Sequence, residues 1–317
     1  MVLVSVLMAS FNHERYISEA IESVLKQSFS DLELIIVDDC STDGSKQIIL
    51  DYQAKDNRVH AFFHKENMGI AKTVNHALDV AKGRFISFIG SDDLWVPKKL
   101  ELQLEVLRKN EDMLVWSEGD IIDAEGNEVG KNFSELNQRS NKPVNGRIYR
   151  ELIHENYIFG QSLIFKRDFC QDLRFNATLR YLSDYQFMVD MGYLHDFLFV
   201  PESLAKYRIH GKNTICRDRN GWLLDRILIR RYFLVQYGKY LSRRQRGNLF
   251  LRIGEAYRDL GDEDTAKACF LKAMRTDFFS AELLLYLSHI IFAPHGILQK
   301  ILFISYSIVS KTLSIFH

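Results

Sequence analysis

The most constraining feature of this 317-residue chain is an alternation, from residue 1 to about residue 120, of short apolar runs with stretches of helical period. Such alternation is typical of βαβ units and a parallel sheet. Because four of the predicted strands are apolar over most of their length, helices are expected on both sheet faces. The predicted strands are residues 2–8, 32–37, 59–63, 84–89 and 113–117, and the predicted helices are about residues 14–27, 44–55, 70–81 and 97–109.

The pattern changes after residue 120. Residues 121–129 place a turn signal between two short β-type runs, which predicts a hairpin. Residues 131–147 are polar and predict a loop, whereas from Gly221 onward the pattern is almost entirely helical. We therefore divide the chain into an α/β domain of residues 1–215 and a helical region of residues 216–317.

Within the helical region, residues 251–262 are followed by Ala266, Phe270 and Ala273 at helical spacing. This pattern resembles one helical hairpin of the tetratricopeptide type. A single repeat cannot bury its own apolar face, so two interpretations stay open. The hairpin is either part of a packed helical tail or the start of a surface for a partner.

The segment 281–316 is apolar, but Pro294, Lys300 and Lys311 interrupt it. A membrane-spanning helix needs about 20 apolar residues in succession, and neither half of the segment provides them. A pair of helices lying at a membrane surface, a helix packed in the core and an oligomer contact remain as alternatives.

Charge and cysteine content exclude some classes of function. The chain has 41 basic and 41 acidic residues, so no overall charge attracts it to nucleic acid. The cysteines lie far apart with no C-x-x-C pair, which indicates a reduced, cytosolic chain. They are Cys40, Cys170, Cys216 and Cys269. The apolar residues 2–9 lack a basic flank and are too few for a span, so a buried strand is expected there instead of a signal peptide.

Adjacent acids follow the second predicted strand, at the edge where sheets of this kind bind ligands. They are Asp38 and Asp39, and Ser41, Thr42 and Asp43 come next. Capping of the following helix accounts for Thr42 or Asp43. Two carboxylates at the end of an apolar strand need hydrogen-bond donors, because desolvation is costly. A nucleobase edge and a ribose hydroxyl would supply such donors.

A second acidic pair, Asp92 and Asp93, follows Gly90 and Ser91 at the end of the fourth predicted strand. Neighbouring carboxylates repel each other, which raises their pKa values unless a cation lies close. A hard divalent cation takes carboxylate ligands and completes its shell with water and substrate phosphates, so a diphosphate donor suits this position. A helix cap is the alternative interpretation.

Ser183 and Asp184 open a third polar cluster, at the start of a helix predicted to run to about residue 191. A serine cap and a first-turn acid would explain both residues without a function. Alternatively, Asp184 is a general base. It would remove the proton of an acceptor hydroxyl as that oxygen attacks an anomeric carbon.

Taken together, these clusters and their order resemble the inverting family 2 glycosyltransferases, which have the GT-A fold. The segments that carry the resemblance are residues 9–12, 16–29, 34–43, 67–69 with Asn75, and 83–93, followed by Trp95, Pro97, Lys99, Leu100 and Gln103. The resemblance implies a Rossmann-like α/β domain for nucleotide diphosphate sugars, followed by the helical C-terminal region.

The resemblance also implies roles for individual residues. Asp92 and Asp93 match the end of the family's D-x-D motif, which positions Mn²⁺ or Mg²⁺ on the diphosphate, although Gly90 stands where an aspartate is often found. Asp184 falls where the family has its catalytic base. The donor would contact residues of the strand-end loops and of a segment that closes over it, namely Ser10, Asn12, Asp38, Asp39, Asn67, Gly69, Lys72, Ser91, Asp92, Arg208 and His210.

The implied activity is metal-dependent, inverting transfer of a sugar from a nucleotide diphosphate donor to a hydroxyl acceptor. A UDP-sugar is the default donor, and a cell-surface polysaccharide or lipid-linked glycan is the default acceptor. The expected location is the cytoplasm, with the C-terminal helices either free of the inner face of the membrane or in peripheral contact with it. A homo-oligomer is a further option.

Two alternatives from other classes accompany this interpretation. A non-catalytic scaffold would bind a sugar nucleotide without turnover and recruit partners through its helical tail. A sugar-nucleotide pyrophosphorylase should carry a glycine-rich, basic loop after the first strand to hold a triphosphate. Residues 10–15 contain no glycine, which argues against the pyrophosphorylase.

Overall fold

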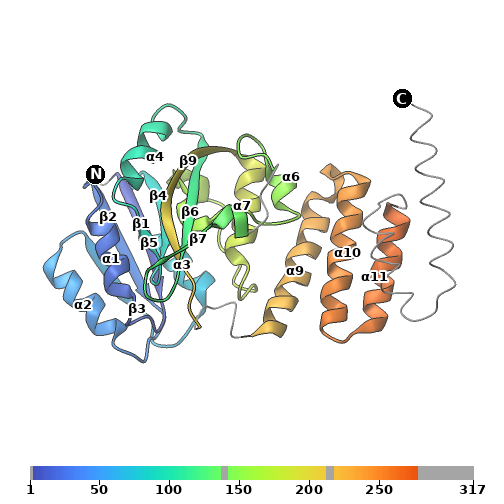
Figure 1. Cartoon of the computed structure of the whole chain (residues 1–317), viewed down its shortest axis with the longest axis horizontal. Helices are drawn as coiled ribbons and strands as arrows, with labels where there is room; N and C mark the ends of the chain where they lie inside the picture. Colours follow the sequence, from blue (N-terminus) through green and yellow to red (C-terminus); the bar gives the residue numbers. More distant parts are fainter. Residues whose placement is uncertain (1–2, 137–141, 212–217, 278–317) are drawn as a thin grey trace. The chain divides into compact units, whose positions relative to one another are not determined.

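A computed structural model describes residues 3–136, 142–211 and 218–277 of the chain (Figure 1). The chain divides into two compact units, Met1–Asp225 and Arg226–His317, and each is described by itself. The domain boundary at residues 215 and 216 stays a prediction. Residues 281–316, for which a membrane-surface role was one alternative, lie outside the described residues.

The first half of the larger unit is a βαβ array of parallel strands. Strand β1 lies between β2 and β4, and β3 pairs with the outer side of β2, all in parallel. The predicted strands and helices of this half are confirmed to within a few residues. The elements are β1 (Val4–Ser10), α1 (Ile17–Leu25), β2 (Leu32–Asp38), α2 (Ser45–Lys55), β3 (Val59–Phe63), α3 (Ile70–Val80) and β4 (Phe85–Gly90).

Burial explains why these strands have little alternation of polar and apolar residues. Every residue of β2 is buried, as are six of the seven residues of β1. Val4, Val6 and Met8 belong to the same buried cluster as the apolar face of α1, and α3 packs against β1 and β2. Because both faces are covered by helices, as predicted, apolar side chains are needed on both sides.

The second half of the unit extends the sheet with mixed strand directions. The full order is β3-β2-β1-β4-β8-β6-β9-β5, and β7 pairs with β6. The helical elements pack around these strands. The elements are β5 (Leu94–Trp95), α4 (Lys99–Leu107), β6 (Met113–Ile122), β7 (Glu128–Asn132), α5 (Phe133–Leu136), α6 (Tyr149–Leu152), η1 (Gly160–Ser162), β8 (Ile164–Lys166), η2 (Arg167–Cys170), α7 (Ser183–Leu194) and β9 (Asp196–Arg208).

The expectation that residues 113–117 continue the parallel array is wrong in one respect. Strand β8 lies between β4 and β6 and is antiparallel to both, since Ile164 pairs with Ser87 on one side and with Val115 on the other. Its three residues are too few to show a period in the sequence. The hydroxyl of Ser87 donates to the carbonyl of Leu163 at 2.5 Å, which further ties β8 to β4.

The predicted hairpin over residues 121–129 is confirmed as the β6–β7 pair. Gly126 takes a positive φ of 91° in the turn, a conformation that glycine adopts without strain. The loop predicted for residues 131–147 is partly wrong, because it contains the end of β7 and the short helix α5.

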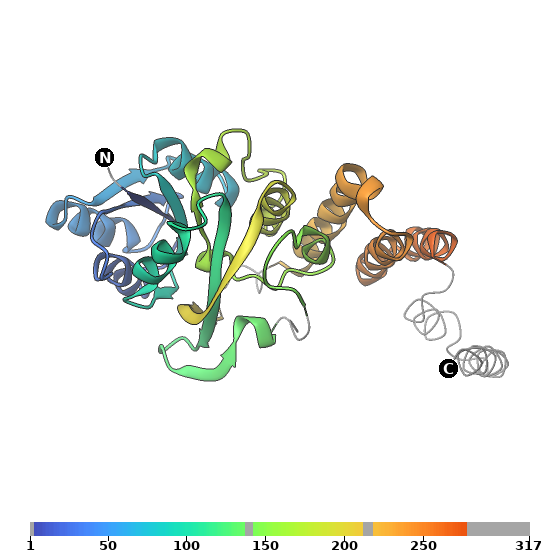
Figure 2. The ribbon, with the colours of Figure 1, turned by 90° about the horizontal axis from the view of Figure 1, so that it is seen from above.

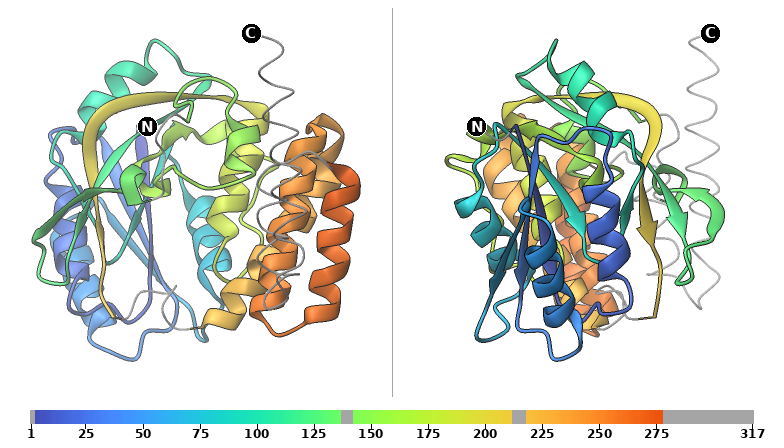
Figure 3. Two further views of the ribbon diagram at one scale, coloured as in Figure 1. Left: turned by 45° about the vertical axis from the view of Figure 1, so that its right-hand side comes forward. Right: turned by 90° about the vertical axis from the view of Figure 1, so that its left-hand side faces the viewer.

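Strand β9 brings the end of the α/β unit back to the loop after β4. It runs parallel beside β6 with bulges near Ser117 and Glu118 (Figure 2) and curves along its length (Figure 3). At its far end it pairs with β5, where Leu94 lies opposite Lys206. Residues that follow β9 are thereby carried to the carboxyl end of β4.

A fully buried lysine joins three elements of the core. The Lys99 ammonium on α4 donates to Ser87 Oγ on β4 at 3.0 Å and to Gln103 Oε1 at 2.8 Å. It also lies 4.0 Å from the centre of the Trp95 ring on β5. Burial lowers the pKa of Lys99 well below its ordinary value. These contacts surround the buried ammonium with two oxygen acceptors and the face of an aromatic ring, each of which attracts a positive charge.

In the smaller unit, helices α10 (Arg243–Asp259) and α11 (Glu263–Thr276) form an antiparallel hairpin, after α9 (Arg219–Tyr237), which begins in the larger unit. Phe270 packs with Leu251, Ala266 and Ala273. Assignment of this hairpin to the tetratricopeptide type stays a prediction. Within the part of the chain that the structure describes, no helix is both long enough and apolar enough to cross a membrane.

We expect Gly83→Ala to destabilise the α/β unit. A β-carbon at residue 83 would lie 2.4 Å from the backbone nitrogen of Ser5, so the turn before β4 would have to move away from β1. Overpacking of this kind costs about 1–3 kcal/mol in the free energy of unfolding, measurable by urea denaturation.

Gly160→Ala is the matched control, because the nearest atom to its added β-carbon, Met188 Sδ, lies at an ordinary 3.6 Å. This control should stay within about 1 kcal/mol of the wild type. Equal stability of the two variants would contradict the close approach of Gly83 to β1.

Candidate functional site

The carboxyl ends of β1, β2 and β4 meet at one edge of the sheet because the three strands are parallel and adjacent. In the register of the sheet, Ser10 lies opposite Asp38, and Ala9 lies opposite Gly90. The loops that follow these strands therefore start side by side. They contain most of the polar residues that the sequence singled out.

The loops after β1 and β2 are joined by hydrogen bonds between their polar groups. Asn12 accepts from the backbone nitrogen of Thr42 at 2.8 Å, and its own backbone nitrogen donates to Ser41 Oγ at 2.9 Å. Asn12 and Cys40 have positive φ angles of 57° and 65°. Such conformations are uncommon outside glycine and concentrate at functional sites.

Asp38 is buried and accepts three hydrogen bonds from these two loops. Ser10 Oγ donates to it at 3.1 Å, and Ser41 donates through its backbone nitrogen at 2.8 Å and its hydroxyl at 2.5 Å. The structure therefore brings Ser10, Asn12 and Asp38 together, as the resemblance implies.

Asp39 connects the end of β2 to the end of β3 and the start of α3. Its carboxylate accepts from the backbone nitrogens of Met68 and Gly69, both at 2.8 Å, and from His64 Nδ1 at 2.8 Å. The Asn67 side chain donates to the Asp39 carbonyl at 3.2 Å. Asp39, Asn67 and Gly69 thus form one cluster.

The argument that a ligand must supply donors to Asp38 and Asp39 is wrong. Serine hydroxyls, backbone amides and a histidine of the chain itself supply them, so burial of these carboxylates is explained by the fold. Lys72, which we expected near the phosphates, is exposed in the first turns of α3. Whether any of these residues contacts a donor stays a prediction.

In the loop after β4, Asp93 is buried and bonded to β9. Its Oδ1 accepts from the backbone nitrogen of Arg208 at 2.8 Å, whereas its Oδ2 has no hydrogen-bond partner among the described residues. Burial and the neighbouring charge of Asp92 raise the pKa of Asp93 well above its ordinary value. The sequence-based expectation of a raised pKa thus holds for this member of the pair.

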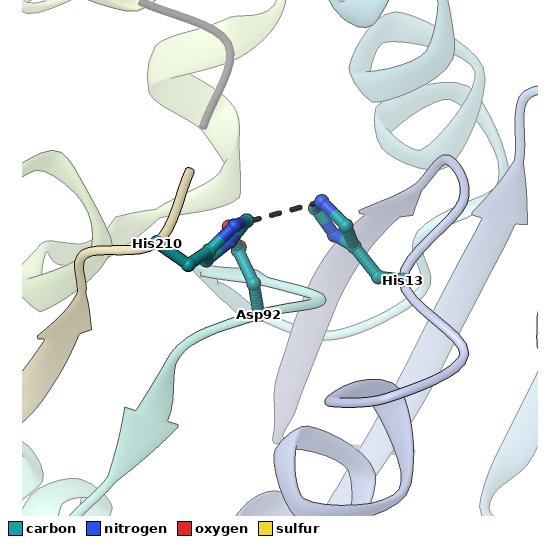
Figure 4. Close-up of side chains that lie close together, drawn as sticks. All are labelled: His13, Asp92 and His210. Atoms are coloured by element: carbon teal, nitrogen blue, oxygen red, sulfur yellow. Dashed lines mark hydrogen bonds and ion pairs between the residues drawn. The ribbon is translucent and has the colours of Figure 1, made fainter. Parts of the chain in front are cut away.

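Asp92 lies instead between two imidazole rings (Figure 4). Its Oδ2 is 3.1 Å from His210 Nε2 and 3.9 Å from His13 Nε2. Burial by itself would raise the pKa of Asp92, but the hydrogen bond with His210 and the charges of His13 and His210 outweigh it and lower the pKa. The pKa values of these two adjacent carboxyl groups are therefore shifted in opposite directions.

His13 is a residue of this site to which the sequence had given no role. Its Nδ1 lies 2.8 Å from Ser91 Oγ, which accounts for that nitrogen and leaves Nε2 directed toward Asp92. One ligand atom from each of His13, Asp92 and His210 lies within 4.8 Å of the other two. The only hint of a role for His13 in the sequence is its position directly after Asn12. No motif or spacing in the sequence connects His13 with Asp92.

This cluster differs from the predicted metal ligands, Asp92 and Asp93. Oδ1 of Asp93 is bonded to β9, and the cluster of possible metal ligands contains Asp92 with two histidines but not Asp93. The described residues thus offer a second set of possible ligands, one carboxylate and two imidazoles, and the acidic pair as metal ligands stays a prediction. His210 was expected near the diphosphate, and the structure places it next to Asp92.

Gly90 explains how two carboxylates fit in so small a space. A β-carbon at residue 90 would lie 2.7 Å from Asp93 Oδ2, 2.8 Å from Asp92 Oδ1 and 3.0 Å from Gln161 Nε2. The backbone nitrogen of Gly90 also donates to Gln161 Oε1. A side chain at this position would therefore require the ends of these three side chains to shift.

Arg208, which we expected near the diphosphate, is bonded within the protein, and its contact with a donor stays a prediction. Its guanidinium is buried and donates to the Asp92 carbonyl at 2.8 Å and to Glu19 at 2.7 Å. It also lies over the Tyr16 ring, 4.9 Å from its centre. Arg208 thereby holds the loop after β4 against β9 and α1.

Asp184 is in the first turn of α7, where Leu182 occupies the N-cap position without a side-chain cap. The predicted Ser183 cap is therefore wrong, and the helix continues to Leu194. Although the Asp184 side chain is open to solvent, protein atoms surround it closely, and the loss of hydration raises its pKa. No described hydrogen bond joins Asp184 to the Asp92 cluster.

Sequence comparison identifies the family to which this arrangement belongs. Residues 5–174, more than half of the chain, match the family model described as Glycosyl transferase family 2. The TuaG glycosyltransferase of Bacillus subtilis, named for teichuronic acid biosynthesis, is 48% identical over 105 residues, which are 33% of this chain and 42% of TuaG.

The Escherichia coli glucosyltransferase WfgD is 39% identical over 120 residues, 38% of this chain and 47% of WfgD. Its name gives UDP-Glc as donor and α-D-GlcNAc-diphosphoundecaprenol as acceptor. The matches to TuaG and WfgD thus span less than half of those proteins.

Structural comparison agrees with the sequence comparison. Staphylococcus aureus TarS, residues 1–349 in complex with UDP-GlcNAc, superposes with a TM-score of 0.65 at 19% identity, over 86% of this chain and 81% of that chain. The predicted GT-A fold is thereby confirmed, including the helical region after the α/β unit. The chain belongs to glycosyl transferase family 2.

Proposed function

We propose that this protein transfers a sugar from a nucleotide diphosphate donor to a hydroxyl acceptor with inversion at the anomeric carbon. One observation carries the proposal. The loops that bind the Asp38 and Asp39 side chains and the His13–Asp92–His210 cluster lie at the same edge of the parallel strands. One part suits a nucleoside, and the other suits the charge of a diphosphate.

The donor nucleoside would lie against Ser10, Asn12, Asp38 and Asp39, with Asn67, Gly69 and Lys72 on the side of α3. Because carboxylates accept but do not donate hydrogen bonds, this region favours N–H and O–H groups. A UDP-sugar is the proposed donor, and the name of WfgD, which includes UDP-Glc, supports it.

A divalent cation fits the His13–Asp92–His210 cluster. Ligand atoms about 2.1 Å from one ion lie within about 4.2 Å of each other. The separations of 3.1 Å and 3.9 Å from Asp92 Oδ2 satisfy this limit, and the two histidine nitrogens lie within 4.8 Å of each other. Ser91 orients His13 in the way that outer hydrogen bonds orient metal-ligating histidines. Two imidazoles favour a transition-metal ion, so Mn²⁺ suits the cluster better than Mg²⁺.

When bound there, the cation would stabilise the negative charge that develops on the diphosphate as it departs. The chain itself contributes the arrangement. Asp93 and Arg208 hold the loop of Asp92 in place, and Gly90 leaves room for both carboxylates. Preorganised groups of this kind need no rearrangement during the reaction.

Asp184 would act as the base in a single displacement. It accepts the proton of the acceptor hydroxyl while the acceptor oxygen forms a bond to the anomeric carbon. The bond from that carbon to the diphosphate oxygen breaks, and the nucleoside diphosphate leaves with the electron pair. A raised pKa makes the Asp184 carboxylate a stronger base than an ordinary aspartate.

The acceptor is proposed to be a lipid-linked or cell-surface glycan. Support comes from the names of the relatives, which include teichuronic acid biosynthesis and a diphosphoundecaprenol-linked sugar. An enzyme for such an acceptor would work from the cytoplasm at the inner face of the membrane. Peripheral membrane contact through the C-terminal region is part of this proposal.

We expect Asp184→Asn to lower kcat by about 10²- to 10⁴-fold, since the amide cannot accept the acceptor proton. The donor KM should change little. Release of UDP from UDP-Glc in the presence of a GlcNAc-diphospho-lipid would measure both constants. Asp172→Asn, at an exposed position, is the control. Full activity of Asp184→Asn would remove Asp184 from the mechanism.

The raised pKa of Asp184 also predicts a pH dependence. The base is active only when deprotonated, so kcat should fall as the pH decreases through an ionisation above the ordinary aspartate value of about 3.9. A pH profile of kcat would reveal this acidic limb. In Asp184→Asn the residual rate should lack it, and a limb of unchanged position in that variant would assign the ionisation to another group.

For the cation, we expect His13→Ala and His210→Ala each to weaken Mn²⁺ binding by at least about 10- to 100-fold, because loss of even an outer partner of a metal ligand costs that much. Calorimetry or Mn²⁺ electron paramagnetic resonance with UDP present would measure the affinity.

Asp93→Asn keeps an acceptor for the Arg208 amide and should retain most of the Mn²⁺ affinity. His60→Ala, in β3, where the histidine side chain is 44% exposed and lies next to Glu33, should leave it unchanged. Loss of Mn²⁺ binding in Asp93→Asn together with wild-type binding in His13→Ala would instead identify Asp92 and Asp93 as the ligands of the cation.

A further inference from the structure

A chain of three side chains extends from Asp39 into the space between β3 and α3. His64 Nδ1 lies 2.8 Å from Asp39 Oδ1, and His64 Nε2 lies 3.0 Å from His76 Nδ1. The two imidazole rings lie edge to edge in nearly the same plane, with centres 5.3 Å apart and planes 10° from parallel. Neither histidine takes part in the mechanism proposed above.

The position of this chain links it to the edge where the strands end. His64 directly follows β3, and its backbone nitrogen donates to the Asp38 carbonyl at 2.9 Å. His76 lies in the middle of α3, where Phe62 of β3 packs against its ring at 5.2 Å. The side chain of Asp39 is 6% exposed and that of His64 is 9% exposed, so the carboxylate is confined but still reachable.

The hydrogen bonds determine which of these groups donates and which accepts. A carboxylate only accepts, so Nδ1 of His64 must carry the proton that is shared with Asp39. Nε2 of His64 then either accepts from His76 Nδ1 or, when His64 is doubly protonated, donates to it. In both states the bond from His64 to Asp39 is retained, and His76 fixes the plane of the His64 ring.

Counting acceptor sites shows what Asp39 has left to offer. A carboxylate has about four lone-pair positions. His64 and Met68 use two on Oδ1, and Gly69 uses one on Oδ2. The hydrogen bonds among the described residues therefore leave about one position, on Oδ2, for an N–H or O–H group of a ligand.

We infer that His64 and His76 are positioning residues for recognition of the donor nucleoside. They hold Asp39 so that its remaining Oδ2 lone pair accepts a single hydrogen bond from the base or the ribose. This inference rests on the proposed function, because it assumes that a nucleotide binds beside Asp39. It goes beyond that function by assigning two residues that make no contact with the donor.

The test compares two replacements of His64 that differ in one hydrogen bond. His64→Asn keeps an N–H donor near the place of Nδ1, whereas His64→Leu removes it. Calorimetry with Mn²⁺ would measure the binding of UDP and, in parallel, of GDP, ADP and inorganic pyrophosphate. The nucleotide that the wild type binds most tightly serves as the reference.

A hydrogen bond to a charged group is worth about tenfold or more when expressed as an affinity. Without the bond from His64 to Asp39, the His64→Leu variant should therefore bind the reference nucleotide at least about tenfold more weakly. His64→Asn should recover most of the affinity. Binding of pyrophosphate should be the same in all variants, because it has no nucleoside. If His64 only stabilises the fold, His64→Leu should instead lower the melting temperature and change the affinities for nucleotide and for pyrophosphate by the same factor.

If His64→Leu does not fold, His76→Leu decides the question, because it leaves all three donors to Asp39 in place. A weaker nucleotide affinity with unchanged pyrophosphate affinity supports the inference. Wild-type nucleotide affinity in His76→Leu, or in a folded His64→Leu, overturns it. Failure of the wild type to bind any of the nucleotides would instead count against the proposed function.

Discussion

The edge of the sheet depends on hydrogen bonds that buried carboxylates accept from segments distant in sequence. A buried carboxylate without donors is unstable, and Asp38, Asp39 and Asp93 each accept at least one hydrogen bond from the chain. Asp38 joins the loops after β1 and β2, Asp39 joins β2 to β3 and α3, and Asp93 joins the loop after β4 to β9. The contacts that stabilise the fold therefore also set the positions of the candidate site residues.

The same network separates the chemistry of neighbouring groups. Asp92 and Asp93 are adjacent in sequence, yet Asp92 lies between two histidines, whereas Asp93 is buried and one of its oxygens has no hydrogen-bond partner in the described part of the chain. Burial dominates for Asp93 and positive partners dominate for Asp92, so their pKa values move in opposite directions. Asp93 is thereby part of the supporting structure, whereas Asp92 belongs to the cluster that we propose for a cation.

Periodicity was sufficient to predict β1 to β4 and the helices between them, because each is long enough to show its pattern. It could not predict β8, whose three residues show no period, or its position between β4 and β6. The meeting of His13 with His210 depends on the pairing of β9 with β5, which nothing local in the sequence reveals. The donors to Asp39 were missed for the same reason, because they come from His64, Met68 and Gly69, whereas the donor Ser41 lies close to Asp38 in the sequence.

Gly90 also limits how this loop can change during evolution. A β-carbon at this position would come within 3.0 Å of the side-chain ends of Asp92, Asp93 and Gln161, so these three groups would have to shift before an aspartate could occupy it. Such a shift would also move the carboxylate that lies between the two histidines, so the glycine and the histidine cluster constrain each other.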